Sequence, residues 1–311
     1  MTHFISCDWG TSNFRLRVVE TKTGEVLETF EENIGIRETY DEWQKRAMKI
    51  DRKPFYLNIL SDKISKLNSS FPENAPVLIS GMASSSIGYK ELPYGQTPFD
   101  LRRPQLVFEK DLQPGSKRNI WLFSGLQTEN DIMRGEETLI LGAYSLDSSD
   151  KTIVLPGTHS KHVSIKNGMV TNFKTYMTGE FFELLSSKSV LQNTVEKSSN
   201  SETEAFKEGV LRGAQENLLN SSFHARTASV LHGRPSKENF EYLSGLLIGA
   251  ELKELKNHDE NVVFICGSGL KQAYETVASV LLTKGSFSFL SVDKAMTEGH
   301  RCLLNGLFQN N

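Results

Sequence analysis

The 311-residue sequence predicts an α/β protein built from two similar halves. Residues 4–19 form an apolar run, a polar turn with a glycine and a second extended run, the pattern of a strand, a tight turn and a strand. Residues 152–176 repeat this order of elements. Residues 261–270 form a buried strand that ends in a glycine turn and continues into a helical pattern. The repeat predicts a duplicated hairpin unit, with one polar turn from each half facing the other.

The turn of the first half has the composition of a phosphate site. Gly10 has no Cβ, so its backbone can turn sharply and approach a ligand closely. Amide groups in such a turn form a concave anion site, and Thr11 and Ser12 add hydroxyl donors. Asp8 ends the first strand, where it is placed to hold Mg²⁺ through the water shell of the ion. The Gly-Lys-Ser/Thr ending of a P-loop is missing. An ordinary hairpin with a polar turn is the alternative.

Composition limits the partners that we expect. The net charge is −3 and the pI about 6.2, so neither nucleic acid nor a membrane surface is an expected partner. No apolar run reaches the roughly 18 residues needed to span a bilayer, and no secretory signal is visible. The cysteines Cys7, Cys266 and Cys302 suit neither a disulfide framework nor a zinc site. These features predict a cytoplasmic globular protein, long enough for two domains.

The rest of the first half predicts further strands and helices. A third strand is expected over residues 26–30. Residues 43–67 predict two helices that meet at Pro54, because proline removes a helix donor and clashes with the preceding turn. Residues 76–81 and 119–125 are short apolar runs typical of buried strands.

The loop over residues 81–94 is rich in glycine, hydroxyl and aromatic residues. Loops at the carboxyl ends of strands in α/β proteins carry ligands. Hydroxyl groups with a cation suit a polar, anionic small molecule, and a solvated surface loop is the alternative. The candidate binding residues are Gly81, Met82, Ser85, Gly88, Lys90 and Tyr94.

Within residues 131–144, apolar residues recur at helical spacing from about Thr138 onward, which predicts a helix. The acidic residues Glu136 and Glu137 at its start favour the positive end of the helix dipole. A carboxylate in the first turn of a helix that faces a cleft would suit a general base. Simple capping of the helix is the alternative.

The polar turn of the second half contains Gly157 and Thr158, followed by His159, Lys161 and His162. The spacing of the two histidines could suit a metal, but no third ligand cluster is evident. We therefore interpret His159 as a hydrogen-bonding group of the turn and Lys161 as a charge partner for phosphate.

The remaining residues predict mainly helices. Residues 193–204 are polar and predict a flexible excursion. Helical patterns follow over residues 205–219 and 240–255. The small residues in the second of these two segments would allow close helix packing. Gly267, Ser268 and Gly269 follow a strand, in a turn that lets a nucleotide approach the backbone while the N-terminus of the next helix faces the ligand. A last strand and helix are expected over residues 286–292 and 297–308.

Five segments in a fixed order carry a family resemblance. They are D-W-G-T-S at 8–12, the loop at 81–94, M-R-G-E-E-T at 133–138, L-P-G-T-H-S-K-H at 155–162 and C-G-S-G-L at 266–270. With them the chain resembles the 2-dehydro-3-deoxygalactonokinase family of the acetate and sugar kinase/Hsp70/actin superfamily, over nearly its whole length. The resemblance implies an α/β fold of two ribonuclease-H-like (actin-like ATPase) domains with mixed sheets around an ATP cleft. The expected domains are residues 1–130 and 131–311, with return of the last helix to the interface as the alternative. It implies Mg²⁺- and ATP-dependent phosphorylation of the 6-hydroxyl of 2-dehydro-3-deoxy-D-galactonate, in galactonate catabolism.

The resemblance also implies residue roles. The first phosphate motif comprises Asp8, Gly10, Thr11 and Ser12, and the second comprises Gly157, Thr158, His159 and Lys161. The adenosine motif comprises Gly267, Ser268 and Gly269, and the loop at 81–94 lies on the sugar side. Glu136 falls where related kinases place the catalytic carboxylate, with Asp131 as the alternative. For a sugar acid, Lys90 and Arg134 are the cations expected to hold the carboxylate, and Arg134 is the better bidentate partner.

Three other functions were weighed. A kinase for a related 2-keto-3-deoxy sugar acid or a ketose is the nearest. A non-catalytic sugar sensor would carry a helix-turn-helix extension or eroded phosphate motifs, and an Hsp70-type ATPase would carry a peptide-binding domain; the sequence contains none of these features. The expected partners are ATP and a small sugar acid, and a homodimer is a hypothesis.

Overall fold

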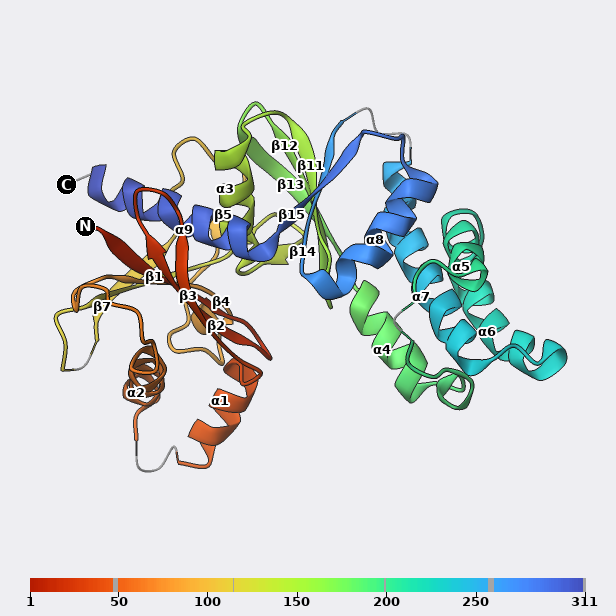
Figure 1. The fold of residues 1–311 in the computed structure, drawn as a ribbon, viewed down its shortest axis with the longest axis horizontal. Helices are drawn as coiled ribbons and strands as arrows, with labels where there is room; N and C mark the ends of the chain where they lie inside the picture. Colours follow the sequence, from red (N-terminus) through yellow and green to blue (C-terminus); the bar gives the residue numbers. More distant parts are fainter. Residues whose placement is uncertain (47–49, 114, 199, 257–259, 310–311) are drawn as a thin grey trace. The chain divides into compact units, whose positions relative to one another are not determined.

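The structure is a computed structural model that describes residues 1–46, 50–113, 115–198, 200–256 and 260–309 (Figure 1). The chain forms two compact units. Unit 1 comprises residues 1–149, 166–172 and 292–311, and unit 2 comprises residues 150–165 and 173–291. These units differ from the division expected at residue 130, because the helices α3 (Glu136–Leu146) and α9 (Val292–Gln309) both belong to unit 1.

A six-stranded mixed sheet, in the order β3-β2-β1-β4-β8-β7, forms the centre of unit 1. Its first three strands form an antiparallel meander: β1 (His3–Trp9), β2 (Phe14–Glu20) and β3 (Val26–Glu32). β4 (Val77–Gly81) runs parallel to β1, β8 (Asn119–Phe123) runs parallel to β4, and β7 (Phe108–Leu112) is an antiparallel edge.

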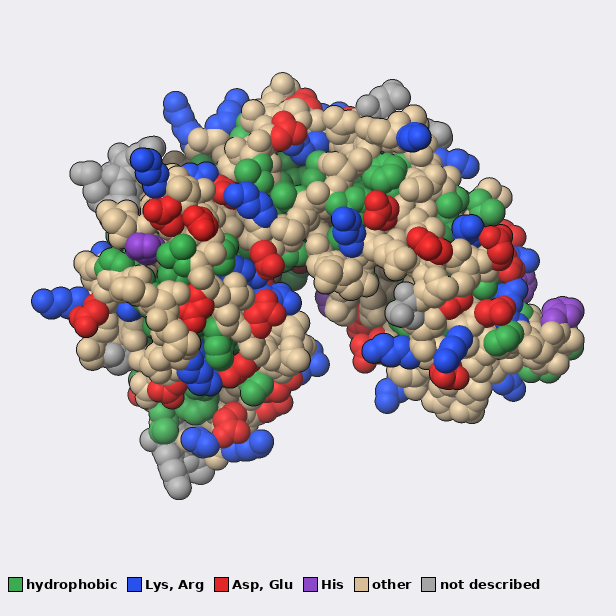
Figure 2. All heavy atoms as spheres, in the orientation of Figure 1, with side chains coloured by type: hydrophobic (Ala, Val, Ile, Leu, Met, Phe, Trp, Pro, Cys, Tyr) green, Lys and Arg blue, Asp and Glu red, His purple; other side chains and the backbone are tan. Residues whose placement is uncertain are grey.

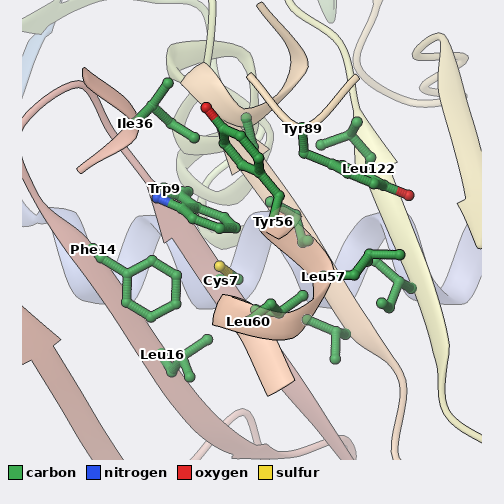
Figure 3. Packing of buried hydrophobic residues seen from close by; sticks show 14 of the residues in the cluster. Cys7, Trp9, Phe14, Leu16, Ile36, Tyr56, Leu57, Leu60, Tyr89 and Leu122 are labelled. Atoms are coloured by element: carbon green, nitrogen blue, oxygen red, sulfur yellow. The ribbon is translucent and has the colours of Figure 1, made fainter. Parts of the chain in front are cut away.

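One face of this sheet packs against α2 (Arg52–Ile64). Side chains alternate between the faces of a strand, so Ile5, Cys7 and Trp9 of β1 all point into this core. Figure 3 shows Trp9 beside Phe14 and Tyr56, with ring centroids 5.0 and 5.7 Å from that of Trp9. The even-numbered residues of β1, which include Asp8, therefore belong to the opposite face.

The opposite face carries α3 and α9, which approach each other through glycines. A Cβ on Gly142 of α3 would overlap the carbonyl oxygen of Ala295, and a Cβ on Gly299 of α9 would overlap that of Thr138. Glycine is required at both positions because the helix backbones are in direct contact.

Five neighbouring strands of the second six-stranded sheet repeat the order β3-β2-β1-β4-β8 of the first, whereas its sixth strand lies at the edge that corresponds to β3 rather than to β8. Its order is β15-β14-β11-β12-β13-β6, formed by β6 (Phe99–Asp100), β11 (Lys151–Leu155), β12 (Ser160–Lys166), β13 (Met169–Tyr176), β14 (Val262–Cys266) and β15 (Phe287–Ser291). β11 is antiparallel to β12 and parallel to β14, as β1 is to β2 and β4. The predicted duplication and the α/β class of two ribonuclease-H-like units with mixed sheets are confirmed.

The described part of unit 2 also contains the helices α4 (Thr178–Lys188), α5 (Glu204–Gln215), α6 (Leu218–His232), α7 (Ser236–Leu252) and α8 (Ser268–Leu281). Figure 1 shows α5, α6 and α7 side by side. The close packing predicted for α7 is confirmed, because a Cβ on Gly245 would overlap the carbonyl oxygen of Phe206 in α5. The sequence did not predict α6, because the buried residues of this helix are small serines and alanines rather than an apolar stripe.

The helices after β3 also differ from the prediction. α1 (Ile36–Gln44) starts before the expected position, and Pro54 is the third residue of α2 rather than a junction of two helices. Proline is tolerated there because the first turn of a helix has no intrahelical acceptor for its amide groups. A small sheet comprises β5 (Gly95–Gln96), β9 (Leu126–Gln127) and β10 (Ile132–Met133).

Within the described ranges, no helix combines the length and apolar character that a membrane span requires. Acidic and basic side chains are interspersed over the face in Figure 2. This mixture agrees with the small net charge of −3.

Candidate active site

The β1–β2 turn is fixed from behind by α1. The amide of Gly10 donates to the carbonyl of Asn13 at 2.9 Å, which closes the turn. The carbonyls of Gly10 and Thr11 accept from the first two amides of α1, at 2.9 and 3.1 Å. Among the described residues, the hydroxyls of Thr11 and Ser12 have no hydrogen-bond partner. The turn therefore uses its carbonyls to pack against α1, and its two hydroxyls are not used by the described residues.

Asp8 lies beside two arginines of β2. It is paired in register with Arg15, whose guanidinium lies 3.4 Å from the carboxylate, and its side chain is 18% exposed. Burial raises the pKa of Asp8 above its usual value, while the charges of Arg17 and then Arg15 oppose this shift. Arg17 is itself buried and paired with Asp293 of α9.

The ends of β1 and β4 meet the start of α3. The parallel register pairs Asp8 with Ser80 and Trp9 with Gly81. Gly81 has a φ of 99°, and a Cβ there would lie 2.7 Å from the carbonyl oxygen of Trp9, so this position requires glycine. A Cβ on Gly135, just before α3, would lie 3.0 Å from the Cα of Gly81. The strand ends and the helix start thus form one polar edge of unit 1.

The loop at 81–94 is compact rather than solvated. The Ser85 hydroxyl donates to the Met82 carbonyl at 2.7 Å, so it is already used inside the loop. Gly88 packs directly on the carbonyl of Ala83. Lys90 donates to Glu109 at 2.5 Å, so its charge has a partner.

Arg134 connects this loop to α3. Its Nη1 donates to the carbonyl and hydroxyl of Ser84 at 2.6 and 2.7 Å, and its Nη2 to the carbonyl of Leu92 at 3.4 Å. The guanidinium lies 4.1 Å from the centroid of the Tyr94 ring. Its Nε is buried and has no hydrogen-bond partner among the described residues.

Glu136 is the first residue of α3, and its Oε2 accepts the amide of Arg134 at 2.8 Å. The structure therefore brings Glu136, Arg134, Tyr94 and Gly81 together. Asp131 lies in the turn between β9 and β10, where its Oδ1 accepts the amide of Ile132 at 2.7 Å. Of the two carboxylates considered, Glu136 stands at the helix start.

A buried network of hydrogen-bonded polar side chains lies beneath this edge and was not predicted from the sequence. His300 of α9 bonds Ser6 at 2.7 Å and Ser80 at 3.0 Å, Ser80 bonds Thr138 at 2.7 Å, and Thr138 donates to Glu137 at 3.3 Å. Burial, followed by the charge of Arg17, lowers the pKa of His300 to about 3. The only sequence signal of this polar network is the presence of serines in otherwise apolar strands. The histidine gives no signal, because it lies about 220 residues after Ser80.

The second turn resembles the first. The amide of Glu180 in α4 donates to the carbonyl of Thr158 at 3.1 Å, so a helix start again braces the turn. His159 bonds Glu180 at 2.6 Å, as expected for a hydrogen-bonding group of the turn. Lys161 is 5% exposed and donates to the His159 carbonyl at 2.9 Å, so it lies inside the turn. Its role as a phosphate partner stays a prediction.

Unit 2 contains a pocket of about 660 Å³ next to this turn, a size typical of small-molecule sites. Gly157, Ser268 and Gly269 line it, so residues of the second phosphate motif and of the adenosine motif share one pocket. A Cβ on Gly157, Gly267 or Gly269 would meet no atom within 4 Å. The start of α8 is therefore open for an anion at its amide groups.

The other walls were not identified from the sequence. They come from α7, with Glu241 and Ser244, and from residues 197, 198, 200 and 201, within the segment that we expected to be a flexible excursion. Phe182, Phe206 and Phe240 supply aromatic surface. A polar segment next to a helix has no sequence pattern that marks a binding site. Only the fold shows that this segment lines a cavity.

The described residues contain no group of three or more His, Cys, Asp or Glu side chains that could hold a metal ion. Mg²⁺, however, binds through one or two carboxylates together with phosphate oxygens and waters. The part-buried Asp8 carboxylate beside a hydroxyl-rich turn fits this ion.

Comparison with known proteins agrees with the resemblance. A family model described as 2-keto-3-deoxy-galactonokinase matches residues 8–308. The probable 2-dehydro-3-deoxygalactonokinase DgoK1 of Rhizobium meliloti (strain 1021) is 30% identical over 286 residues, which cover 88% of each chain. The 2-dehydro-3-deoxygalactonokinase of Escherichia coli (strain K12) is 35% identical over 213 residues, covering 65% of this chain and 70% of that protein.

A solved structure has the same fold along the whole chain. The crystal structure assigned as a 2-dehydro-3-deoxygalactonokinase from Sinorhizobium meliloti superposes with a TM-score of 0.81 and 27% identity, covering 99% of both chains. The family model spans nearly the whole sequence. The chain therefore belongs to the 2-keto-3-deoxy-galactonokinase family.

Proposed function

We propose that this protein is a kinase that transfers the γ-phosphate of ATP to the 6-hydroxyl of 2-dehydro-3-deoxy-D-galactonate. One observation carries the proposal within the family. At the start of α3, a carboxylate (Glu136) and a guanidinium with an unused buried donor (Arg134) lie together beside the Gly81 loop. A sugar-acid kinase needs these two groups, a base for the hydroxyl and a cation for the carboxylate.

Arg134 is the proposed reader of the substrate carboxylate. Its Nη1 is committed to Ser84, which fixes the plane of the guanidinium, while Nε has no described partner. Nε and Nη2 lie on one edge and can donate side by side to a carboxylate. Lys90 is the weaker candidate because it already pairs with Glu109.

Glu136 is the proposed general base. The Arg134 amide holds its Oε2 at the helix start, so the carboxylate and the guanidinium keep a fixed relation. In phosphoryl transfer the protein mainly positions the groups, and a carboxylate accepts the proton of the attacking hydroxyl. Glu136 would take the proton of the 6-hydroxyl as the oxygen–phosphorus bond forms.

The nucleotide is proposed to bind in the unit 2 pocket. The open α8 start and the glycines of the β11–β12 turn suit phosphate oxygens, and the aromatic walls suit a nucleoside. Asp8 would hold Mg²⁺, which when bound would neutralise charge on the transferring phosphate. A cytoplasmic location belongs to the same proposal, supported by three free cysteines.

The test is a phosphorylation assay with ATP, Mg²⁺ and a panel of 2-keto-3-deoxy acids, ketoses and neutral hexoses. We expect the highest kcat/KM with 2-dehydro-3-deoxy-D-galactonate. Glu136→Gln should lower kcat by about 10²-fold or more, and Asp131→Asn is the matched control, expected to keep near wild-type kcat. Preference for a neutral sugar would contradict the substrate class, and the reverse effect of the two variants would contradict the assignment of the base.

A further inference from the structure

The inner wall of the unit 2 pocket contains a carboxylate that is held in place by two hydroxyls. Glu241 of α7 is 6% exposed and lines the pocket. Its Oε1 accepts the hydroxyl of Ser198 at 2.5 Å, and its Oε2 accepts that of Thr203 at 2.8 Å. Thr203 in turn caps α5 through the amide of Phe206 at 3.2 Å. Each carboxylate oxygen can accept more than one hydrogen bond, so Glu241 keeps capacity for a ligand donor.

The same wall contains a buried hydroxyl without a partner. Ser201 is 5% exposed and lines the pocket, and its Oγ makes no hydrogen bond with any described residue. Buried polar atoms in native proteins are nearly always paired, so an unpaired one on a cavity wall needs an explanation such as a ligand partner. Glu241 and Ser201 thus place an acceptor and a hydroxyl on one pocket wall.

Charge and shape decide which part of a nucleotide reaches this wall. A carboxylate repels phosphate groups, which belong at the open start of α8. The pocket also has apolar lining: Phe240 packs edge-on against Phe182 with ring centroids 4.8 Å apart, and Leu247 and Ile248 line the same pocket. A flat heterocycle fits such aromatic and aliphatic walls, with a few polar groups to fix its orientation.

Resting on the proposed function, we propose that Glu241 and Ser201 read the adenine base of the nucleotide. Glu241 accepts a hydrogen bond from the 6-amino group, and Ser201 donates to a ring nitrogen. Ser198 and Thr203 hold the Glu241 carboxylate in place, so Ser198, residues 200–203 and α7 form one recognition wall.

The experiment measures dissociation constants by calorimetry, without sugar, for ATP, for purine riboside triphosphate and for 2′-deoxy-ATP. Purine riboside triphosphate lacks only the 6-amino group. A hydrogen bond to a charged acceptor corresponds to roughly tenfold or more in affinity. Wild-type protein should therefore bind ATP about tenfold more tightly than the riboside analogue, and 2′-deoxy-ATP nearly as tightly as ATP.

Three variants separate recognition from structure. Glu241→Gln should bring the ratio between ATP and the riboside analogue close to one, because a neutral amide accepts the amino group less strongly. Ser201→Ala should weaken both ligands alike and keep the ratio, because the ring nitrogens are common to both. Glu238→Gln is the matched control on the exposed first turn of α7 and should change nothing. Ser201→Ala loses no hydrogen bond of the folded protein, so it tests the proposal even if Glu241→Gln unfolds.

The outcomes distinguish this inference from the proposed function. Suppose that wild-type protein binds ATP but binds purine riboside triphosphate equally tightly, or loses affinity only when the 2′-hydroxyl is removed. Recognition of the adenine base by this wall is then wrong, while the kinase proposal stands. If ATP does not bind at all, both proposals are wrong. An unchanged ratio in a folded Glu241→Gln protein also overturns the base-reading role.

Discussion

The backbone amide of Gly135 donates a hydrogen bond to Oε2 of Glu137 at 2.7 Å, although Glu137 is only 1% exposed. This bond closes the turn that leads into α3, where Gly135 has a φ of 104°. Glu137 also receives the hydroxyl of Thr138 at the end of the buried polar network that contains Ser6 and His300. The residue beside the proposed base is therefore an internal support of the site.

Glu137 should make stability depend on pH. Burial, followed by the charge of Glu136, raises its pKa to about 8. Between the unfolded value near 4.3 and about 8, the folded chain binds more protons than the unfolded chain, so the free energy of unfolding falls as pH rises through this window. The slope is at most about 1.4 kcal/mol per pH unit for one such group.

Glu137→Gln should remove this part of the slope and should be more stable than the wild type above pH 8. Denaturant unfolding at intervals from pH 5 to pH 9 checks this. Parallel curves for the two proteins would show that Glu137 does not titrate in this window.

The contact between α3 and α9 should not tolerate a side chain. In Gly142→Ala, the new Cβ would overlap the carbonyl oxygen of Ala295, so the helices must separate. We expect a loss of about 1–3 kcal/mol or more, as for other overpacked cores. Gly306→Ala on α9 is the matched control, because its Cβ would meet nothing within 4 Å. Thermal unfolding of both variants is the measurement, and equal midpoints would contradict the direct helix contact.

Asp8→Asn should lower kcat by orders of magnitude while the fold survives. The substitution keeps the shape of the side chain but removes the charge that would hold Mg²⁺, and positioned metal charge contributes several kcal/mol to phosphoryl transfer. Arg15 keeps a second partner in Glu31 at 3.3 Å, so its position does not depend on Asp8 alone. Turnover is measured across a Mg²⁺ titration, with circular dichroism as the fold control. A folded variant with wild-type turnover would contradict the role.

Arg134→Lys should raise KM for the sugar acid far more than KM for ATP. Lysine keeps the charge but lacks the planar guanidinium edge whose two parallel N–H groups would bind the carboxylate while Nη1 stays on Ser84, so the expected loss is roughly tenfold or more. Lys90→Ala is the comparison and should have a smaller effect because Lys90 pairs with Glu109. Paired steady-state kinetics on both substrates decide this. If Arg134→Lys leaves the sugar KM unchanged, the carboxylate is held elsewhere.

The neutral amide of the sugar acid should also be a poor substrate of the wild type and should lose little further in Arg134→Lys.

The sequence by itself determined the duplicated strand order, both glycine turns and the position of Glu136 at a helix start. These features are local, since the period of a strand or helix and the turn residues lie within a few positions of each other. Motif order also identified the family. Prediction failed where tertiary contacts decide the element, as for α6, which buries small serines and alanines and packs against α7.

Only the tertiary structure decided which distant groups meet. It joined Ser6, Ser80 and Thr138 to His300 and paired Lys90 with Glu109, and among the described residues it gave the Nε of Arg134 no partner. The tertiary structure also places Ser198 and Ser201 on the wall of the pocket, where Ser198 donates to Glu241. Such contacts join segments that lie far apart in the sequence and meet only when the chain folds. The pattern of residues within one segment does not show which residue of another segment will pack against it.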